Sequence, residues 1–106
     1  MLKLTIRPKA QFDIDDIIDY LLSERPANAE DFVSDLQRTF DSLVDNPKIG
    51  VKRTYRAPAL NQMRMFPLKQ FSAYLVFYIA DDDTLDIVRV IHGSKDIVNL
   101  FETENL

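Results

Sequence analysis

The chain has 106 residues, of which 46% are hydrophobic and 28% are charged, and it contains only 2 glycines. We therefore expect one globular domain over residues 1–106, rather than a disordered tail or a fibrous repeat. It has no cysteine and one histidine, His92, which excludes disulfides, thiolate nucleophiles, cysteine zinc sites and paired imidazole ligands, and we expect no cofactor and no metal. No apolar run approaches about 18 residues and no signal segment is recognisable, so we expect a cytoplasmic protein without membrane contact. The net charge of −4 argues against a protein that coats nucleic acid, and no specific nucleic-acid binding is expected.

A strand and a helix are predicted first. Leu2, Leu4 and Ile6 alternate with polar residues, the pattern of a half-buried strand, and Pro8 ends it. Pro8 also suits the first position of a helix, and apolar residues then recur at intervals of three and four. These are Ala10, Ile14, Ile17, Ile18, Leu21 and Leu22. The acidic residues of this segment, between positions 13 and 19, are expected mostly on the opposite, solvated face.

A second amphipathic helix is predicted up to Asn46-Pro47. Arg25-Pro26 interrupts the first one, because the residue before a proline is pushed out of the helical region. The apolar positions of the second helix are Ala29, Phe32, Val33, Leu36, Phe40, Leu43 and Val44. With so short a break, the two helices are expected to pack antiparallel, with both apolar stripes facing one core.

An unbroken basic stretch follows, in an otherwise acidic chain. Residues 46–80 carry six Lys or Arg and no Asp or Glu. Residues 51–61, which include Arg53 and Arg56, show no periodicity and are expected to form a loop. The cations are either solvated and paired with acids of the neighbouring helices, or a docking surface for an anionic partner. Composition alone leaves both interpretations open.

Three strands are predicted in the second half of the chain. A short one around Met65 ends at Pro67. Residues 73–79 form a continuous aromatic and β-branched run, typical of a strand covered on both faces. Residues 85–92 follow after the polar turn at 81–84, and the spacing predicts a β-hairpin.

A last short helix holds Ile97, Leu100 and Phe101, with Ser94 expected as its cap. The order is therefore β-α-α-β-β-β-α, an α+β fold of two layers. Its N-terminal strand belongs to a mainly antiparallel sheet, and an α-helical hairpin packs on one face of that sheet. We expect the other face to stay open for another molecule.

Few residues are suited to catalysis. General acid–base chemistry needs a group that titrates near neutral pH, and the one candidate is His92; a lone histidine at a strand end is more often structural. The carboxylates of the 81–83 turn and of the first helix are expected to be solvated, and Gly50 and Gly93 cannot build a phosphate-binding glycine loop. We therefore assign no catalytic residue.

Three basic residues lie within or at the start of the predicted strands and the last helix. Arg64 begins a strand, Arg89 interrupts an apolar strand, and Lys95 lies at the start of the last helix. Burying Arg89 without a partner would be costly, so it either pairs with an acid from a helix or faces a binding partner from an open sheet face. Both alternatives remain at this point.

A family resemblance is carried by two segments, Tyr74–Tyr78 and Asp86–Asp96, which read YLVFY and DIVRVIHGSKD. They resemble the C-terminal signature of ParE-type toxins, in the RelE/ParE superfamily of toxin–antitoxin systems, often labelled plasmid stabilisation proteins. The turn from Asn46-Pro47 to Gly50 and the placement of Arg64 before a Phe-Pro strand fit as well. The resemblance covers nearly the whole chain and implies the RelE/ParE-like fold derived above.

The resemblance also implies two functional branches. RelE-like members cleave messenger RNA in the ribosome, with basic side chains on the sheet and commonly a tyrosine near the C-terminus. ParE-like members inhibit DNA gyrase without a demonstrated catalytic site. Here Phe101 stands where a RelE-like enzyme tends to have its tyrosine, and Gly93 rather than a tyrosine follows His92. These departures favour the ParE branch.

The sequence thus predicts a non-enzymatic toxin that inhibits DNA gyrase, and hence replication, and that is neutralised by a ParD-like antitoxin with an acidic, partly disordered segment. The alternatives are a ribosome-dependent mRNA endoribonuclease and a degenerate, non-toxic homologue that only binds its antitoxin. The candidate contact residues for target or antitoxin are Arg53, Arg56, Arg64, Arg89, His92 and Lys95.

Overall fold

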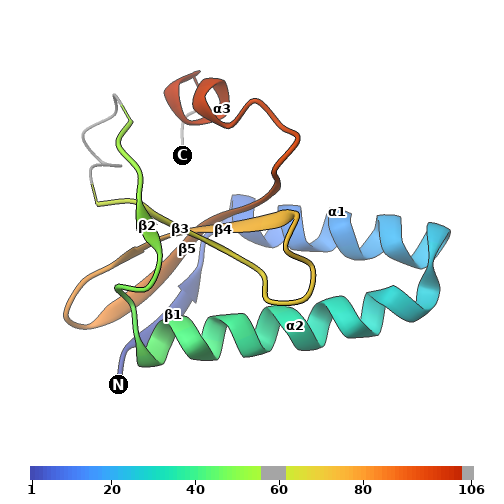
Figure 1. Ribbon diagram of the computed structural model, residues 1–106, viewed down its shortest axis with the longest axis horizontal. Helices are drawn as coiled ribbons and strands as arrows, with labels where there is room; N and C mark the ends of the chain where they lie inside the picture. Colours follow the sequence, from blue (N-terminus) through green and yellow to red (C-terminus); the bar gives the residue numbers. More distant parts are fainter. Residues whose placement is uncertain (56–61, 104–106) are drawn as a thin grey trace.

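The fold is built on a five-stranded mixed sheet (Figure 1), seen in a computed structural model that describes residues 1–55 and 62–103. The elements in chain order are β1 (Lys3–Ile6), α1 (Pro8–Glu24), α2 (Pro26–Asp45), β2 (Val51–Lys52), β3 (Arg64–Pro67), β4 (Tyr74–Ala80), β5 (Thr84–His92) and α3 (Ile97–Thr103). The strand order is β1-β5-β4-β3-β2. Only β1 and β5 run parallel, and the other neighbours are antiparallel. This arrangement confirms the predicted α+β class.

The helical hairpin forms where the two prolines predict it. Pro8 and Pro26 each occupy the first turn of a helix, where a missing N–H costs nothing. Arg25 lies between the helices with φ −148° and ψ 78°, outside the helical region, as expected before a proline. The two helices therefore turn back on one another and cover the same face of the sheet (Figure 1).

The main core lies between this hairpin and the sheet. Phe32 and Leu43 of α2 are fully buried, as are Val76 and Ile87 of the central strands. The other buried members of this cluster are Ala10, Ile14, Leu21, Ala29, Leu36, Phe40, Leu68, Tyr78, Leu85 and Val90. Both predicted apolar stripes thus contribute to one core, and removing this surface from water stabilises the hairpin on the sheet.

The expectation of an open second sheet face is wrong, because the chain covers that face itself. Phe101 of α3 is 1% exposed and its ring centroid lies 4.8 Å from that of Phe77. Tyr55 packs beside it, with ring centroids 4.9 Å apart, and Met63, Val88 and Ile91 complete a second cluster. The physical reason is that β4 and β5 are apolar on both faces, so an uncovered face would expose large side chains to water.

A β-bulge interrupts the pairing of β4 with β5. Phe77 lies opposite Arg89 but Tyr78 lies opposite Ile87, so Val88 is an extra residue in β5. As a result Ile87 and Val90, three positions apart, both join the core under the helices. Arg89 lies between them, past the point where the pairing with β1 ends.

Two local expectations need correction. Residues 51 and 52, predicted as loop, form a two-residue strand paired with Arg64 and Met65 of β3. The last helix begins at Ile97, and Asp96 rather than Ser94 caps it: its carboxylate accepts the Asn99 N–H at 3.3 Å.

No helix within residues 1–55 and 62–103 has the length and hydropathy of a membrane span.

Candidate partner-binding groove

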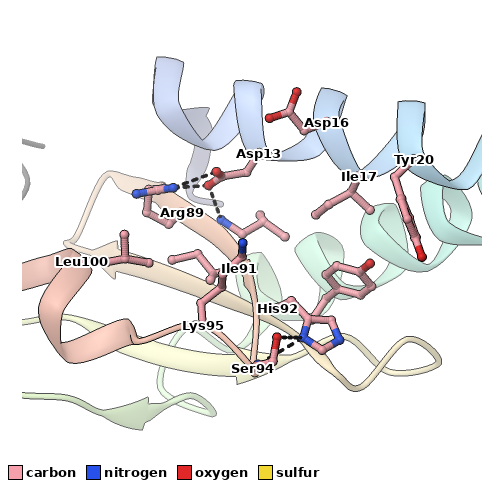
Figure 2. Close-up of a pocket in the computed structure, with 12 residues that line it drawn as sticks. Asp13, Asp16, Ile17, Tyr20, Arg89, Ile91, His92, Ser94, Lys95 and Leu100 are labelled. Atoms are coloured by element: carbon pink, nitrogen blue, oxygen red, sulfur yellow. Dashed lines mark hydrogen bonds and ion pairs between the residues drawn. The ribbon is translucent and has the colours of Figure 1, made fainter.

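A hollow of about 590 Å³ lies between α1, the end of β5 and the start of α3 (Figure 2). We call it the α1–β5 groove. Its α1 wall carries Asp16 and Tyr20, and its opposite wall carries His92 and Lys95. Arg89 lies at one end, so three of the six sequence-predicted contact residues meet here.

Arg89 forms a two-pronged ion pair with Asp13 of α1. Its Nε lies 2.7 Å from Oδ2 and its Nη2 lies 2.9 Å from Oδ1 (Figure 2). The two side chains are only 12% and 15% exposed. Of the two alternatives for Arg89, pairing with a helix acid is therefore confirmed. Asp13, expected on a solvated face, instead faces the sheet, because it occupies the side of α1 that carries Ala10 and Ile17.

The same carboxylate closes part of a sheet edge. β1 pairs with β5 only as far as Ile87, so β5 continues to His92 with no described strand on that side. Asp13 Oδ2 accepts the Val90 N–H at 3.0 Å. A side chain of α1 thus takes the place of a strand at this edge, which satisfies a backbone donor that would otherwise be left without a partner.

His92 is fixed by its neighbours at the other end of the groove. Its ring packs edge-on against Tyr74, with centroids 5.1 Å apart. The Ser94 N–H donates to Nδ1 at 3.1 Å, and the Ser94 hydroxyl lies 2.8 Å from the same nitrogen (Figure 2). Nδ1 of His92 thus accepts a hydrogen bond from the backbone of its own chain, and its lone pair is already engaged in this contact.

Arg64 lies away from the groove and stabilises the turn between α2 and β2. Its Nη1 donates to the carbonyl oxygens of Gly50 at 2.8 Å and Lys48 at 3.2 Å. The hydroxyl of buried Tyr78 donates to the Pro47 carbonyl at 2.6 Å and accepts the Gly50 N–H at 2.9 Å. Burial raises the pKa of Tyr78 above its ordinary value of 10.0, although the Gly50 N–H and nearby Arg64 oppose the shift.

This turn also explains why position 50 is a glycine. A Cβ on Gly50 would overlap the Tyr78 hydroxyl and lie only 2.8 Å from the ring carbon Cε1. The turn from Asn46 to Gly50 and the residues Arg64 and Tyr78 therefore form one structural unit. Arg64 contributes to its stability, because its Nη1 donates to two backbone carbonyls of the turn.

Arg53 lies on a different surface. It is exposed and lines a second hollow, of about 390 Å³, together with Lys52, Tyr55 and Val98. Its own N–H donates to the Met63 carbonyl at 2.8 Å, which continues the β2–β3 pairing. The prediction for Arg56 lies outside the described residues.

The sequence did not lead us to predict that two acidic side chains of the helices have structural roles. Asp13 is one, and the fully buried Asp35 of α2 is the other: its Oδ2 accepts the N–H groups of Gln70 and Phe71 at 2.9 and 2.8 Å. Each lies within or beside an apolar stripe. Asp35 falls between Phe32 and Leu36, and Asp13 lies on the side of α1 that carries Ala10 and Ile17. An acid at such a position is a signal for a buried carboxylate with a partner elsewhere in the chain.

The family model described as the ParE toxin of the type II toxin–antitoxin system parDE matches residues 4–97. This range includes the hairpin, all of β1 but Lys3, the strands β2 to β5, and all residues of the α1–β5 groove but Leu100. The chain belongs to the ParE toxin family. Its fold is similar to that of solved structures. A chain of the chromosomal ParDE toxin–antitoxin system from P. aeruginosa matches with a TM-score of 0.69 and 22% identity, over 87% of this chain and 96% of that one.

A second similar structure is the solution structure of the conserved hypothetical protein HP0894 from Helicobacter pylori. It matches with a TM-score of 0.51 and 20% identity, over 90% of this chain and 98% of that chain. At these identities both structures show the fold alone. No curated protein matches the chain.

Proposed function

We propose that this ParE-family protein is a toxin that inhibits DNA gyrase by binding to it, without catalytic chemistry of its own. The observation that carries the proposal is the state of the residues that a nuclease would use. Arg89 is held by Asp13, Arg64 is held by backbone carbonyls, and Nδ1 of His92 accepts the Ser94 N–H. Each of the three candidates is thus occupied by a contact within the chain.

The alternative, a ribosome-dependent endoribonuclease, has less support. Cleavage of RNA needs a general base within reach of the attacking hydroxyl and cations that stabilise the developing phosphate charge. Nδ1 of His92 accepts the Ser94 N–H, and Arg89 forms an ion pair with Asp13. Phe101, at the position where a catalytic tyrosine is common in RelE-like enzymes, is buried against Phe77 and Tyr55 and contributes packing.

We further propose that a ParD-like antitoxin neutralises the protein. A segment that orders on binding must bury a large surface to offset the lost conformational entropy. The chain offers two separate surfaces for it: the α1–β5 groove, and the basic surface at Lys52 and Arg53. The second suits acidic side chains, in agreement with the alternative of an anionic docking partner for the basic stretch.

Induction of the protein without an antitoxin tests this function in cells. DNA synthesis should stop while primer extension finds translated messages intact. Cuts within translated messages would instead establish the endoribonuclease. Unimpaired growth and DNA synthesis at a verified level of protein would identify a non-toxic homologue.

A further inference from the structure

We propose that the edge of the sheet at β2 binds the phosphate backbone of duplex DNA, independently of the base sequence. We call this surface the basic edge, and it consists of Lys48, Lys52, Arg53 and Arg64. The inference rests on the proposed function only in taking the DNA held by gyrase as the duplex that the toxin meets. It adds a second macromolecule to the contacts of the toxin, beside gyrase itself.

The four basic residues lie close together on one edge of the molecule. β2 is an outer strand of the sheet (Figure 1), and Lys52 and Arg53 are exposed there. Arg64 lies in the neighbouring strand β3, directly opposite Lys52. Its Nη1 donates to the Lys48 carbonyl, which brings the exposed Lys48 to the same edge. The chain therefore gathers four cations from two neighbouring strands and the turn that precedes them.

These cations are not neutralised by carboxylates of the chain. Residues 46–80 contain no Asp or Glu, and within the described part of the chain none of the four cations forms an ion pair. Arg7 and Arg89, which lie elsewhere, each pair with an aspartate, at 2.8 and 2.7 Å. Of the two interpretations of the basic stretch, pairing with helix acids therefore fails for these four residues. Their charge stays available for an anionic partner.

The fold also holds two of these charges against each other. Lys52 and Arg64 occupy directly opposite positions of the β2–β3 pair, where like charges are unfavourable. Arg64 is nevertheless fixed in place, because its Nη1 donates to the carbonyls of Gly50 and Lys48 at 2.8 and 3.2 Å. These carbonyls orient the guanidinium without cancelling its charge. A phosphate bound beside the two cations would replace their repulsion by two attractions.

A phosphate backbone explains this edge better than a stably bound acidic protein segment. An extended segment would add to the sheet as a strand, but β2 has only two residues and offers few backbone groups for it. Phosphates need only cations spread along a surface, and such contacts carry no base-sequence information. The same charges can still steer an acidic antitoxin segment during encounter, because steering acts at a distance and needs no lasting contact.

Binding of the purified chain to a short fluorescent duplex tests the inference without gyrase. The logarithm of the affinity should fall linearly with the logarithm of the salt concentration, with a slope of about −3. Lys52→Gln with Arg53→Gln should weaken binding at low salt by about ten-fold and bring the slope about two units closer to zero. The matched control, Lys3→Gln with Arg25→Gln, removes one lysine and one arginine from exposed positions elsewhere and should leave the slope unchanged.

A second measurement locates the contact in the complex with gyrase. Because the chain has no cysteine, Thr54→Cys creates a single thiol next to the basic edge, and Ser34→Cys creates one on the exposed side of α2. Each thiol is labelled with a photoactivated crosslinker, and the labelled chain is added to gyrase on plasmid DNA. Position 54 should crosslink to the DNA, and position 34 should not.

The inference is overturned if the chain does not bind the duplex at low salt, or if the Lys52 and Arg53 variant keeps the wild-type slope. Polyglutamate that competes as well as unlabelled DNA of equal charge would also overturn it, and would identify an acidic protein as the partner. Inhibited gyrase without a crosslink from position 54 contradicts it equally. Failure of the gyrase proposal has a different signature: supercoiling would continue unaffected while the duplex still bound with the expected dependence on Lys52 and Arg53.

Discussion

Asp13 in the first helix and Arg89 in the last strand are 76 positions apart in the chain, and their side chains meet through two hydrogen bonds of 2.7 and 2.9 Å. The contact lies where β1 ends, so it fastens α1 to the part of β5 that has no neighbouring strand there. It also forms one end of the α1–β5 groove. One ion pair therefore stabilises the fold and shapes the proposed binding surface.

Replacing Asp13 by alanine should destabilise the protein. The change removes the two-pronged carboxylate contact from the largely buried guanidinium of Arg89 and the side-chain acceptor from the Val90 N–H, and we expect a loss of about 2–4 kcal/mol in the free energy of unfolding. Denaturation in urea measures it. The control Asp19→Ala, at an exposed position of the same helix, should cost less than about 0.5 kcal/mol. Equal midpoints for the two variants would show that the pair contributes nothing.

Gly50→Ala tests the close approach of the turn to Tyr78. The added methyl group overlaps the tyrosine hydroxyl, and we expect a cost of about 1–3 kcal/mol from displacement of the ring or the turn. Gly93→Ala is the matched control, because a Cβ there finds its nearest atom, the Ala73 carbonyl oxygen, at an ordinary 3.4 Å. For Gly50→Ala, the midpoint temperature of thermal unfolding should therefore be well below that of Gly93→Ala. The reverse order would contradict the described packing.

Tyr78→Phe should change how stability depends on alkaline pH. Burial raises the pKa of Tyr78, so above its ordinary value of 10.0 the native state retains a proton that the unfolded chain loses. Stability thus falls as the pH rises through this range. Near neutral pH the variant is less stable than the wild type by about 1–3 kcal/mol, because the Pro47 carbonyl and the Gly50 N–H lose their partner.

Above pH 10.0 the difference between the two proteins should narrow, because the variant has no hydroxyl to ionise there. Urea titrations at several alkaline pH values measure this difference, with Tyr20→Phe as an exposed control. A difference that stays constant up to the pH of complete tyrosine ionisation would show that Tyr78 is not held protonated by burial.

The basic surface at Lys52 and Arg53 should accelerate the encounter with an acidic antitoxin segment. We expect Lys52→Glu with Arg53→Glu to slow association by about ten-fold at low salt and to flatten its dependence on ionic strength. Stopped-flow mixing measures the rate, with Lys3→Glu on the opposite edge strand as the control. An unchanged association rate would remove this surface from the encounter.

Local patterns predicted most of the fold. The two amphipathic stripes, the interruption at Arg25-Pro26 and the continuous apolar run at 73–79 each appear in the structure as expected. These signals are local, because the periodicity of side chains and the restrictions of proline act within a few residues. The two-residue strand β2 was missed since a strand of that length has no period to detect.

The covering of the second sheet face and the groove itself depend on contacts between distant segments. Phe101 was recognised as apolar, but nothing local shows that α3 folds back over Phe77. Arg89 was identified as a residue that needs a partner, yet the choice between a helix acid and a binding partner required the position of α1. Asp13 was grouped with the three other acids within positions 13–19 and assigned to solvent, although it lies beside the apolar stripe, three positions after Ala10 and four before Ile17.

The action on DNA gyrase is tested most directly by a supercoiling assay with purified gyrase, relaxed plasmid and the purified chain. We predict that supercoiling is lost, that cleaved plasmid accumulates in a trapped gyrase–DNA complex, and that prior addition of the antitoxin restores activity. Undiminished supercoiling with no cleaved plasmid, at a large excess of folded protein over gyrase, would contradict the proposal.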